Sequence, residues 1–235
     1  MSDESKKLAA ERAIEFVQDG QVVGLGTGST AKFAIEGIGR RVGEGLRVTG
    51  VATSIATARM AQGLGIPVTN LNDVPAIDIT IDGADEVDGD LNMIKGGGGA
   101  LTREKLVALA STKRVIIVDD RKLVSALGES WPVPVEVLPF AWTRSALMLT
   151  ALGCAAQLRM SGGKPFETDN ENYILDCRFG AISDSSELEK SIKLIPGVIE
   201  CGLFIGIADV LVIGFSDRVE IRERKPDLKQ DIKVL

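Results

Sequence analysis

The side chains best suited to acid–base chemistry are concentrated between residues 82 and 105. This stretch holds Asp82 and Asp85, then Lys95 directly before four consecutive glycines, and then Glu104. Consecutive glycines do not favour a stable fold, because each ordered glycine loses more backbone entropy than any other residue. A glycine loop does, however, let a ligand approach the backbone N–H groups closely. With carboxylates and a lysine to move protons and stabilise negative charge, the stretch predicts an active site for a small anionic molecule.

Each of these residues also has a purely structural interpretation. Asp82-Gly83-Ala84-Asp85 has the composition of an ordinary turn, and a lysine such as Lys95 is more often solvated than catalytic. Glu104 would lie in the first turn of a helix, where the macrodipole favours an acidic residue by roughly 0.3–1 kcal/mol. The turn follows the very apolar run Ile77–Ile81 and precedes the glycines, which favours the functional interpretation.

A second glycine-rich segment lies upstream, in Gly24-Leu25-Gly26-Thr27-Gly28-Ser29-Thr30. It is neither a dinucleotide fingerprint, because Ser29 stands where the third glycine should be, nor a Walker A loop, because no lysine precedes Ser29. Between a strand and a helix, N–H groups and the helix dipole favour an anion. With the hydroxyls of Thr27, Ser29 and Thr30, the segment predicts a site for a single phosphate. The alternative is a tight turn with no ligand.

The chain of 235 residues contains no histidine. Acid–base chemistry near neutral pH therefore falls to carboxylates or lysine, and a catalytic zinc site is not expected. The three cysteines Cys154, Cys177 and Cys201 are widely spaced, without a C-x-x-C pattern. This usage is typical of reduced thiols in a cytoplasmic protein.

Strands and helices that could position these residues alternate along the chain. Strands are predicted over residues 22–25, 47–52, 67–71, 77–81 and 114–118, and helices over residues 5–18, 54–64 and 101–110, with another helix following Thr30. Such alternation predicts an α/β fold, a Rossmann-like and mostly parallel sheet flanked by helices. Ligands bind at the carboxyl ends of strands in open α/β sheets. The glycine segment at Gly26, the Thr53-Ser54 turn, the Asp82–Asp85 turn and Asp119-Asp120 could therefore line one crevice.

The pattern changes at Trp131–Pro139, where three prolines predict an edge or connecting strand. The strands and helices that follow predict a smaller α+β unit. The apolar run Val210–Ile213 then suits the first sheet. We therefore expect residues 1–130 and 205–235 to form an α/β catalytic domain, residues 131–204 to form an inserted α+β domain, and the charged tail from Glu223 to be solvated.

The formal net charge of −6 argues against binding to nucleic acid or an anionic membrane. No apolar run approaches the ~18 residues that a membrane span requires, and the N-terminal residues lack the apolar core of a signal peptide. We expect a soluble, cytoplasmic protein with neither nucleic-acid nor membrane partners.

In combination, these motifs resemble those of the type A ribose-5-phosphate isomerase family. The site motifs that carry the resemblance are Gly26–Thr30, Asp82–Glu86 and Ile94–Lys105. Further matches outside the site are Pro134–Val137, Thr168–Asn170, Tyr173–Asp176, Ile195–Val198 and Gly202–Phe204. The likeness thus runs in order through nearly the whole chain.

The resemblance implies reversible conversion of D-ribose 5-phosphate to D-ribulose 5-phosphate in the pentose phosphate pathway, without a metal or organic cofactor. It implies Glu104 as the proton acceptor and shuttle, with Asp82, Asp85 and Lys95 as further catalytic residues. The implied substrate-binding residues are Thr27, Gly28, Ser29, Thr30, Gly83, Ala84, Gly96, Gly97, Gly98 and Lys122. Either Lys6 or Lys7 could reach the phosphate, and a homodimer or higher homo-oligomer is expected.

The sequence departs from the family pattern in two places: Arg121 stands where many relatives have a small residue, and Asn170-Glu171-Asn172 stands in place of Asn-Gly-Asn. Two alternatives to the isomerase stay open at this stage. One is a related enzyme on a similar scaffold, a sugar-phosphate isomerase/deaminase or a lactonase, although a deaminase would be expected to use histidine. The other is a non-catalytic module that senses a sugar phosphate.

Overall fold

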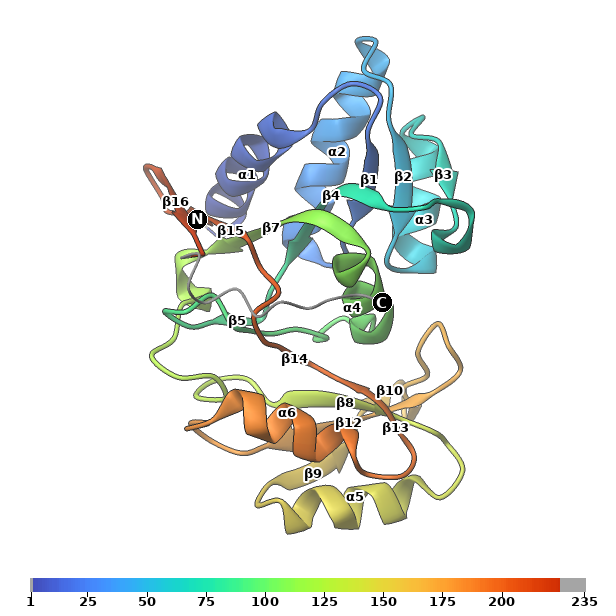
Figure 1. Ribbon diagram of the computed structural model, residues 1–235, viewed down its shortest axis with the longest axis vertical. Helices are drawn as coiled ribbons and strands as arrows, with labels where there is room; N and C mark the ends of the chain where they lie inside the picture. The colour runs from blue at the N-terminus through green and yellow to red at the C-terminus, as the bar shows by residue number, and fades with distance from the viewer. Residues whose placement is uncertain (1, 225–235) are drawn as a thin grey trace. The chain divides into compact units, whose positions relative to one another are not determined.

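The computed structural model describes residues 2–224, which form two compact units (Figure 1). The first unit comprises residues 2–84, 103–122 and 206–224, and the second comprises residues 85–102 and 123–205. Each unit has its own hydrophobic core. Residues 225–235, which include most of the tail expected to be solvated, lie outside the described residues.

The first unit is built on a seven-stranded sheet with the order β16-β15-β7-β4-β1-β2-β3. Its strands are β1 (Val22–Leu25), β2 (Thr49–Ala52), β3 (Val68–Thr69), β4 (Ile77–Gly83), β7 (Ser111–Asp119), β15 (Val210–Gly214) and β16 (Val219–Glu223). All neighbouring strands are parallel except β15 and β16. Val210 lies opposite Val115 of β7, so the apolar run at residues 210–213 returns to the first sheet as the sequence predicts.

Helices pack on both faces of this sheet (Figure 1). They are α1 (Ser2–Ala13), α2 (Ser29–Gly43), α3 (Ile55–Gly63) and α4 (Leu101–Leu109). In β4, Ile79 and Ile81 belong to the core cluster that includes α1 and α2. Thr80, between them, points to the opposite face, where it and Val107 of α4 close around Gly24. The predicted α/β fold, with a mostly parallel sheet flanked by helices, is confirmed.

The second unit is an α+β structure. A four-stranded antiparallel sheet has the order β13-β8-β12-β9. Its elements are β8 (Val133–Val137), α5 (Trp142–Ala151), β9 (Ala155–Leu158), β12 (Tyr173–Arg178), α6 (Ser185–Lys193) and β13 (Val198–Cys201), with a hairpin of β10 (Met160–Ser161) and β11 (Lys164–Pro165). Leu149 of α5 and Ile192 of α6 are fully buried in the same core as the strands.

The boundaries of the observed units differ from those of the expected domains around three two-residue strands. These strands are β5 (Glu86–Val87), β6 (Met93–Ile94) and β14 (Leu203–Phe204), which form a separate sheet of the second unit. Residues 85–102 and 123–130, which we expected in the α/β domain, therefore pack with the inserted segment. The two-domain organisation itself stays a prediction.

Strand β8 is an interior strand, and the expectation that its prolines would confine it to an edge or a connection is wrong. It pairs with β12 on one side and β13 on the other. Pro134 is tolerated because β13 pairs only with residues 135–137. Beyond the end of β13, Pro134 contributes its carbonyl, which accepts the N–H of Gly202 at 2.7 Å, and a proline has no N–H to leave unpaired there.

Among residues 2–224, none of the helices combines the length and the apolar composition needed to cross a membrane.

Candidate active site

In the first unit, the Gly26–Thr30 segment joins β1 to α2 and is held tightly against β4. The N–H of Gly26 donates to the carbonyl of Ile81 at 3.0 Å. A Cβ on Gly26 would lie 2.1 Å from Oδ1 of Asp82, so no side chain fits there. Gly28 has φ of 116° and directly precedes the 15-residue helix α2. The backbone thus presents a helix N-terminus, a geometry suited to an anion.

The Thr27 hydroxyl belongs to an internal cluster. It lies 2.7 Å from Thr53 Oγ1, 2.9 Å from Ser54 Oγ and 3.1 Å from Thr57 Oγ1. Thr57 also donates to the carbonyl of Gly26, and Ser54 caps α3 by accepting the N–H of Thr57. The Thr27 side chain therefore fixes the loop from within, and Ser29 and Thr30 are left as the loop's hydroxyls that can face a phosphate.

Lys6 of α1 lies at the same loop. Its Nζ donates to Ser29 Oγ at 3.0 Å, and its side chain is 15% exposed. Lys7, in contrast, is half exposed and lies 4.0 Å from Glu11 on its own helix. Of the two lysines that the sequence left open, Lys6 is the one that the structure places beside Ser29.

Asp82 connects the loop to the end of β4. Its side chain is buried, and Oδ1 accepts the N–H groups of Thr27 at 3.1 Å and Gly83 at 2.7 Å. Since β4 is parallel to both β1 and β7, their carboxyl ends meet along one edge. The first unit therefore brings Thr27, Asp82 and Gly83 together where the sequence predicted.

Lys122 lies in the turn that follows β7, a 3-10 helix over Asp120–Lys122. The turn begins next to buried Asp119, whose carboxylate accepts the N–H, Nε and Nη2 of Arg121 at 2.8–3.2 Å. Burial acts to raise the pKa of Asp119, but the hydrogen bonds and charge of Arg121 outweigh it and hold that pKa below its usual value. Arg121 thus fixes the turn that carries Lys122.

Glu104 lies in the first turn of α4 and is buried, with 4% of its surface exposed. Lys105, beside it, is buried as well. A buried carboxylate at this position of a helix has little water to solvate its charge, which is the environment that a carboxylate base requires.

Ala84, which directly follows β4, completes the predicted residues of the first unit, and Asp85, Lys95 and the glycine loop lie in the second unit. Asp85 Oδ2 accepts the N–H of Gly97 at 2.7 Å, and the N–H of Asp85 donates to the carbonyl of Ile94. Lys95 is buried, with its Nζ 5.5 Å from the centre of the Phe204 ring. Gly96 is buried, whereas Gly97 and Gly98 are exposed. This unit thus brings Asp85, Lys95 and the loop together.

The sequence patterns did not single out Thr57 or Arg159, which both hold predicted loops. Thr57 follows Ser54 by three residues, the spacing of a helix cap, so its backbone role was open to prediction. Arg159 donates to the carbonyls of Gly96 and Gly97, more than 60 residues away in sequence. No local signal reveals such a contact.

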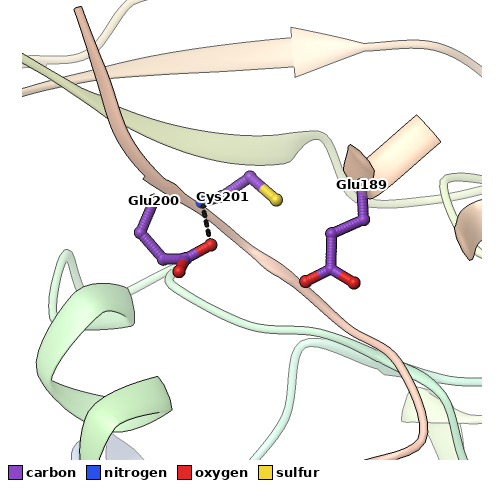
Figure 2. A group of neighbouring side chains, drawn as sticks. All are labelled: Glu189, Glu200 and Cys201. Carbon is purple, nitrogen blue, oxygen red and sulfur yellow. Dashed lines mark hydrogen bonds between the residues drawn. The ribbon is translucent and has the colours of Figure 1, made fainter. Parts of the chain in front are cut away.

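One group of potential metal ligands occurs in the described part of the chain. Figure 2 shows Glu189, Glu200 and Cys201, whose ligand atoms lie within 4.8 Å of one another. The Glu200 carboxylate already accepts hydrogen bonds from the ammonium of Lys193 at 3.1 Å and from the N–H of Cys201 at 2.9 Å. The charge of that carboxylate is therefore balanced by a lysine, and none of the three residues belongs to the predicted site.

The fold and the site together define a class of α/β enzymes. The loop before α2 is suited to bind an anion, and the buried carboxylates Asp82 and Asp119 lie at the carboxyl ends of parallel strands. The family model of ribose 5-phosphate isomerase A (phosphoriboisomerase A) matches residues 49–218. A ribose-5-phosphate isomerase A of Parvibaculum lavamentivorans is 49% identical, with 94% of this chain and 99% of that relative covered. The chain belongs to the ribose 5-phosphate isomerase A family, and the resemblance found in the sequence is confirmed.

Solved structures agree with this assignment. A D-ribose-5-phosphate isomerase in complex with phospho-erythronic acid superposes with a TM-score of 0.93 at 42% identity, covering 95% of this chain and 100% of that one. The ribose 5-phosphate isomerase of Plasmodium falciparum gives a TM-score of 0.92 at 42% identity, covering 95% and 99%. The whole scaffold, including the second unit, is therefore that of the family.

Proposed function

We propose that the protein interconverts D-ribose 5-phosphate and D-ribulose 5-phosphate. Membership of the ribose 5-phosphate isomerase A family over nearly the full chain is the observation that carries this proposal. Neither the deaminase or lactonase alternative nor the sensor alternative is favoured by the relatives. The enzyme is an aldose–ketose isomerase that acts on the open-chain sugar phosphate.

The reaction moves one carbon-bound proton between neighbouring carbons. We assign Glu104 as the base that takes the proton from C2 of the aldose and returns it to C1 of the enediolate. A carboxylate in a buried position can do both steps without histidine. Asp82, Asp85 and Lys95 are assigned to the hydroxyl proton transfer between O2 and O1 and to stabilising the developing oxyanion.

Substrate binding is assigned to three segments. The α2 N-terminus, with Gly28, Ser29 and Thr30, holds the phosphate, and Lys6 beside Ser29 supplies a positive charge. Lys122 is a second candidate cation. Backbone groups of two further segments position the sugar. They belong to Thr27, Gly83 and Ala84 and to the loop Gly96, Gly97 and Gly98.

The proposal also covers the setting of the enzyme. We propose a cytoplasmic enzyme of the non-oxidative pentose phosphate pathway that acts without a metal or organic cofactor and works as a homodimer or larger homo-oligomer. The first unit is proposed as the catalytic domain, and the second unit, which contains both the inserted segment and the glycine loop, as a smaller domain.

The test is a direct assay with Glu104→Gln as the informative variant. Purified wild-type protein with EDTA should form ketose from ribose 5-phosphate, and Glu104→Gln should lower kcat by about 10²–10⁴-fold, or about 3–5 kcal/mol of barrier. Binding of ribose 5-phosphate, measured by calorimetry, should change little because the phosphate contacts remain.

The matched control is Glu44→Gln, at an exposed glutamate after α2, which should keep wild-type kcat. Wild-type protein that forms no ketose would refute the isomerase. A Glu104→Gln variant with wild-type kcat would refute the role of Glu104 alone.

A further inference from the structure

Arg159 is the anchor of the glycine loop within the second unit. It lies between β9 and β10, and its side chain is only 15% exposed. Nε and Nη2 bind the two carboxylate oxygens of Asp176, with the Nε bond at 2.9 Å. The remaining nitrogen, Nη1, donates to the carbonyls of Gly96 at 2.9 Å and Gly97 at 3.1 Å. One guanidinium thus joins strand β12 to two consecutive peptide groups of the loop.

These contacts determine where the loop N–H groups point. In a trans peptide the C=O and the following N–H point in opposite directions, and no peptide of the described chain is cis. The peptide between Gly96 and Gly97 is fixed at both ends, since its carbonyl binds Arg159 and its N–H donates to Asp85. The next peptide has its carbonyl on Arg159, so the N–H of Gly98 points away from the guanidinium.

That N–H is open to a ligand. Gly98 is exposed, and its N–H makes no hydrogen bond within residues 2–224. The adjacent turn is closed, because the N–H of Gly99 donates to the carbonyl of Gly96 at 3.0 Å. The loop therefore presents one oriented donor between two peptides that are already engaged.

Phe166 supports the loop together with Arg159. The guanidinium lies 5.8 Å from the centre of the Phe166 ring, and the N–H of Phe166 donates to the Arg159 carbonyl at 2.9 Å. A Cβ on Gly99 would lie 2.4 Å from this ring, so the loop backbone rests directly on it. Lysine could not replace Arg159, because one ammonium cannot bind a carboxylate side-on and also reach two carbonyls.

We propose that Arg159, held by Asp176, is a positioning residue for the isomerase reaction: it orients the Gly97–Gly98 peptide so that the Gly98 N–H donates to an oxygen of the bound sugar. This inference rests on the proposed function. A donor fixed before the reaction stabilises developing negative charge without the cost of reorganisation, and loss of one such donor lowers kcat by about 10²–10³-fold. Loss of its orientation alone should lower kcat by roughly 10- to 100-fold.

The test compares Arg159→Lys and Arg159→Ala with wild type and with Arg178→Ala, a control at an exposed arginine of β12 in the same sheet. Both Arg159 variants should lose about 10- to 100-fold in kcat for ribose 5-phosphate, with KM changed by less than about threefold, since the phosphate contacts lie elsewhere. Guanidinium chloride at non-denaturing concentration should restore part of the kcat of Arg159→Ala and leave Arg178→Ala unchanged.

Wild-type kcat in either folded Arg159 variant would overturn the proposal, as would a loss of kcat in Arg159→Ala that guanidinium does not restore. If Arg159→Ala fails to fold, Arg159→Lys alone tests the proposal. A loss of kcat with little change in KM supports it, and an unchanged kcat overturns it. Wild-type protein without isomerase activity would instead refute the proposed function. Equal activity in wild type and variants would refute only the role of Arg159.

Discussion

Glu171 is one of three non-glycine residues of the described chain with a positive φ, together with Leu91 and Ala141. Its φ is +62°, in the left-handed region that glycine adopts without penalty, and its side chain is exposed. It occupies the position where the sequence departs from an Asn-Gly-Asn pattern. The turn is nevertheless well formed, because the N–H of Glu171 donates to the Thr168 carbonyl at 2.9 Å and the N–H of Thr168 donates to the Asn172 carbonyl.

We expect Glu171→Gly to raise the free energy of unfolding by about 0.5–1 kcal/mol. The left-handed region costs a non-glycine residue roughly 1–2 kcal/mol, and the larger entropy of glycine in the unfolded chain offsets part of that gain. Urea unfolding followed by circular dichroism measures the change.

The control for this prediction is Glu187→Gly, the same substitution on helix α6, which should lower stability by about 1 kcal/mol. Destabilisation by both substitutions would mean that the Glu171 side chain contributes more to the turn than its backbone strain costs.

Individual residues show which contacts of the site can be predicted from sequence and which cannot. Asp82 and Gly26 could be found because their neighbours in sequence form motifs, and the structure brings them into contact distance. The role of Arg159 could not be predicted. Its hydrogen-bond partners depend on the pairing of β9 with β12 and on the path of a loop that is distant in sequence. For Thr27 the sequence indicated a hydroxyl for phosphate, whereas Thr53, Ser54 and Thr57 surround that hydroxyl.

At the scale of elements, Glu136 of β8 joins three segments of the second unit. It is fully buried, and its carboxylate accepts hydrogen bonds from Thr102 at the start of α4, from Thr168, and from the amides of Asn170 and Asn172. A buried carboxylate is costly unless donors surround it, and four donors compensate here. The strand thus holds the end of the glycine loop and the 168–172 turn in place.

Glu136→Gln should lower the free energy of unfolding by about 2 kcal/mol. The amide turns a donor toward groups that are themselves donors and leaves them unsatisfied, at about 1–3 kcal/mol. Glu136→Ala should cost at least as much, since all four donors lose their acceptor. Chemical denaturation measures both values.

Glu187→Gln, at an exposed position of α6, is the matched control and should change stability by less than about 0.5 kcal/mol. A Glu136→Gln protein as stable as wild type would show that the four donors find other partners when the charge is removed.

Elements with strong local signals were predicted well, and short elements were not. The apolar strands β4, β7 and β15 and the capped helix α3 lie within a few residues of their predicted bounds. The two-residue strands β5, β6 and β14 carry no periodicity to detect, and their pairing depends on contacts across the chain. Pro134 misled the prediction because only tertiary context shows that its partner strand ends at Cys201.

On the scale of the whole molecule, the large apolar side chains exposed within residues 2–224 lie mainly on the second unit. The most exposed are Phe140 at 90%, Leu194 at 83% and Leu147 at 62%. A homodimer or larger homo-oligomer that uses this unit as its interface would cover these side chains.

Light scattering should therefore give a mass of at least twice the 25.0 kDa of one chain. Phe140→Asp combined with Leu147→Asp should lower the measured mass at micromolar concentration, because charges disfavour burial at an apolar contact. Ile55→Asp, at an exposed apolar residue of the first unit, serves as the control. A wild-type mass of one chain would refute the oligomer.

The placement of β15 beside β7 has a consequence for synthesis on the ribosome. Residues 120–209 separate the two strands in sequence. At about 5–20 residues per second, β7 waits roughly 5–18 s for its partner. During that time its apolar edge is open to mispairing with other nascent chains. Most of the second unit, residues 123–205, is continuous in sequence and emerges after β7 but before β15. Slow translation before residue 210 should therefore increase aggregation of the newly made protein.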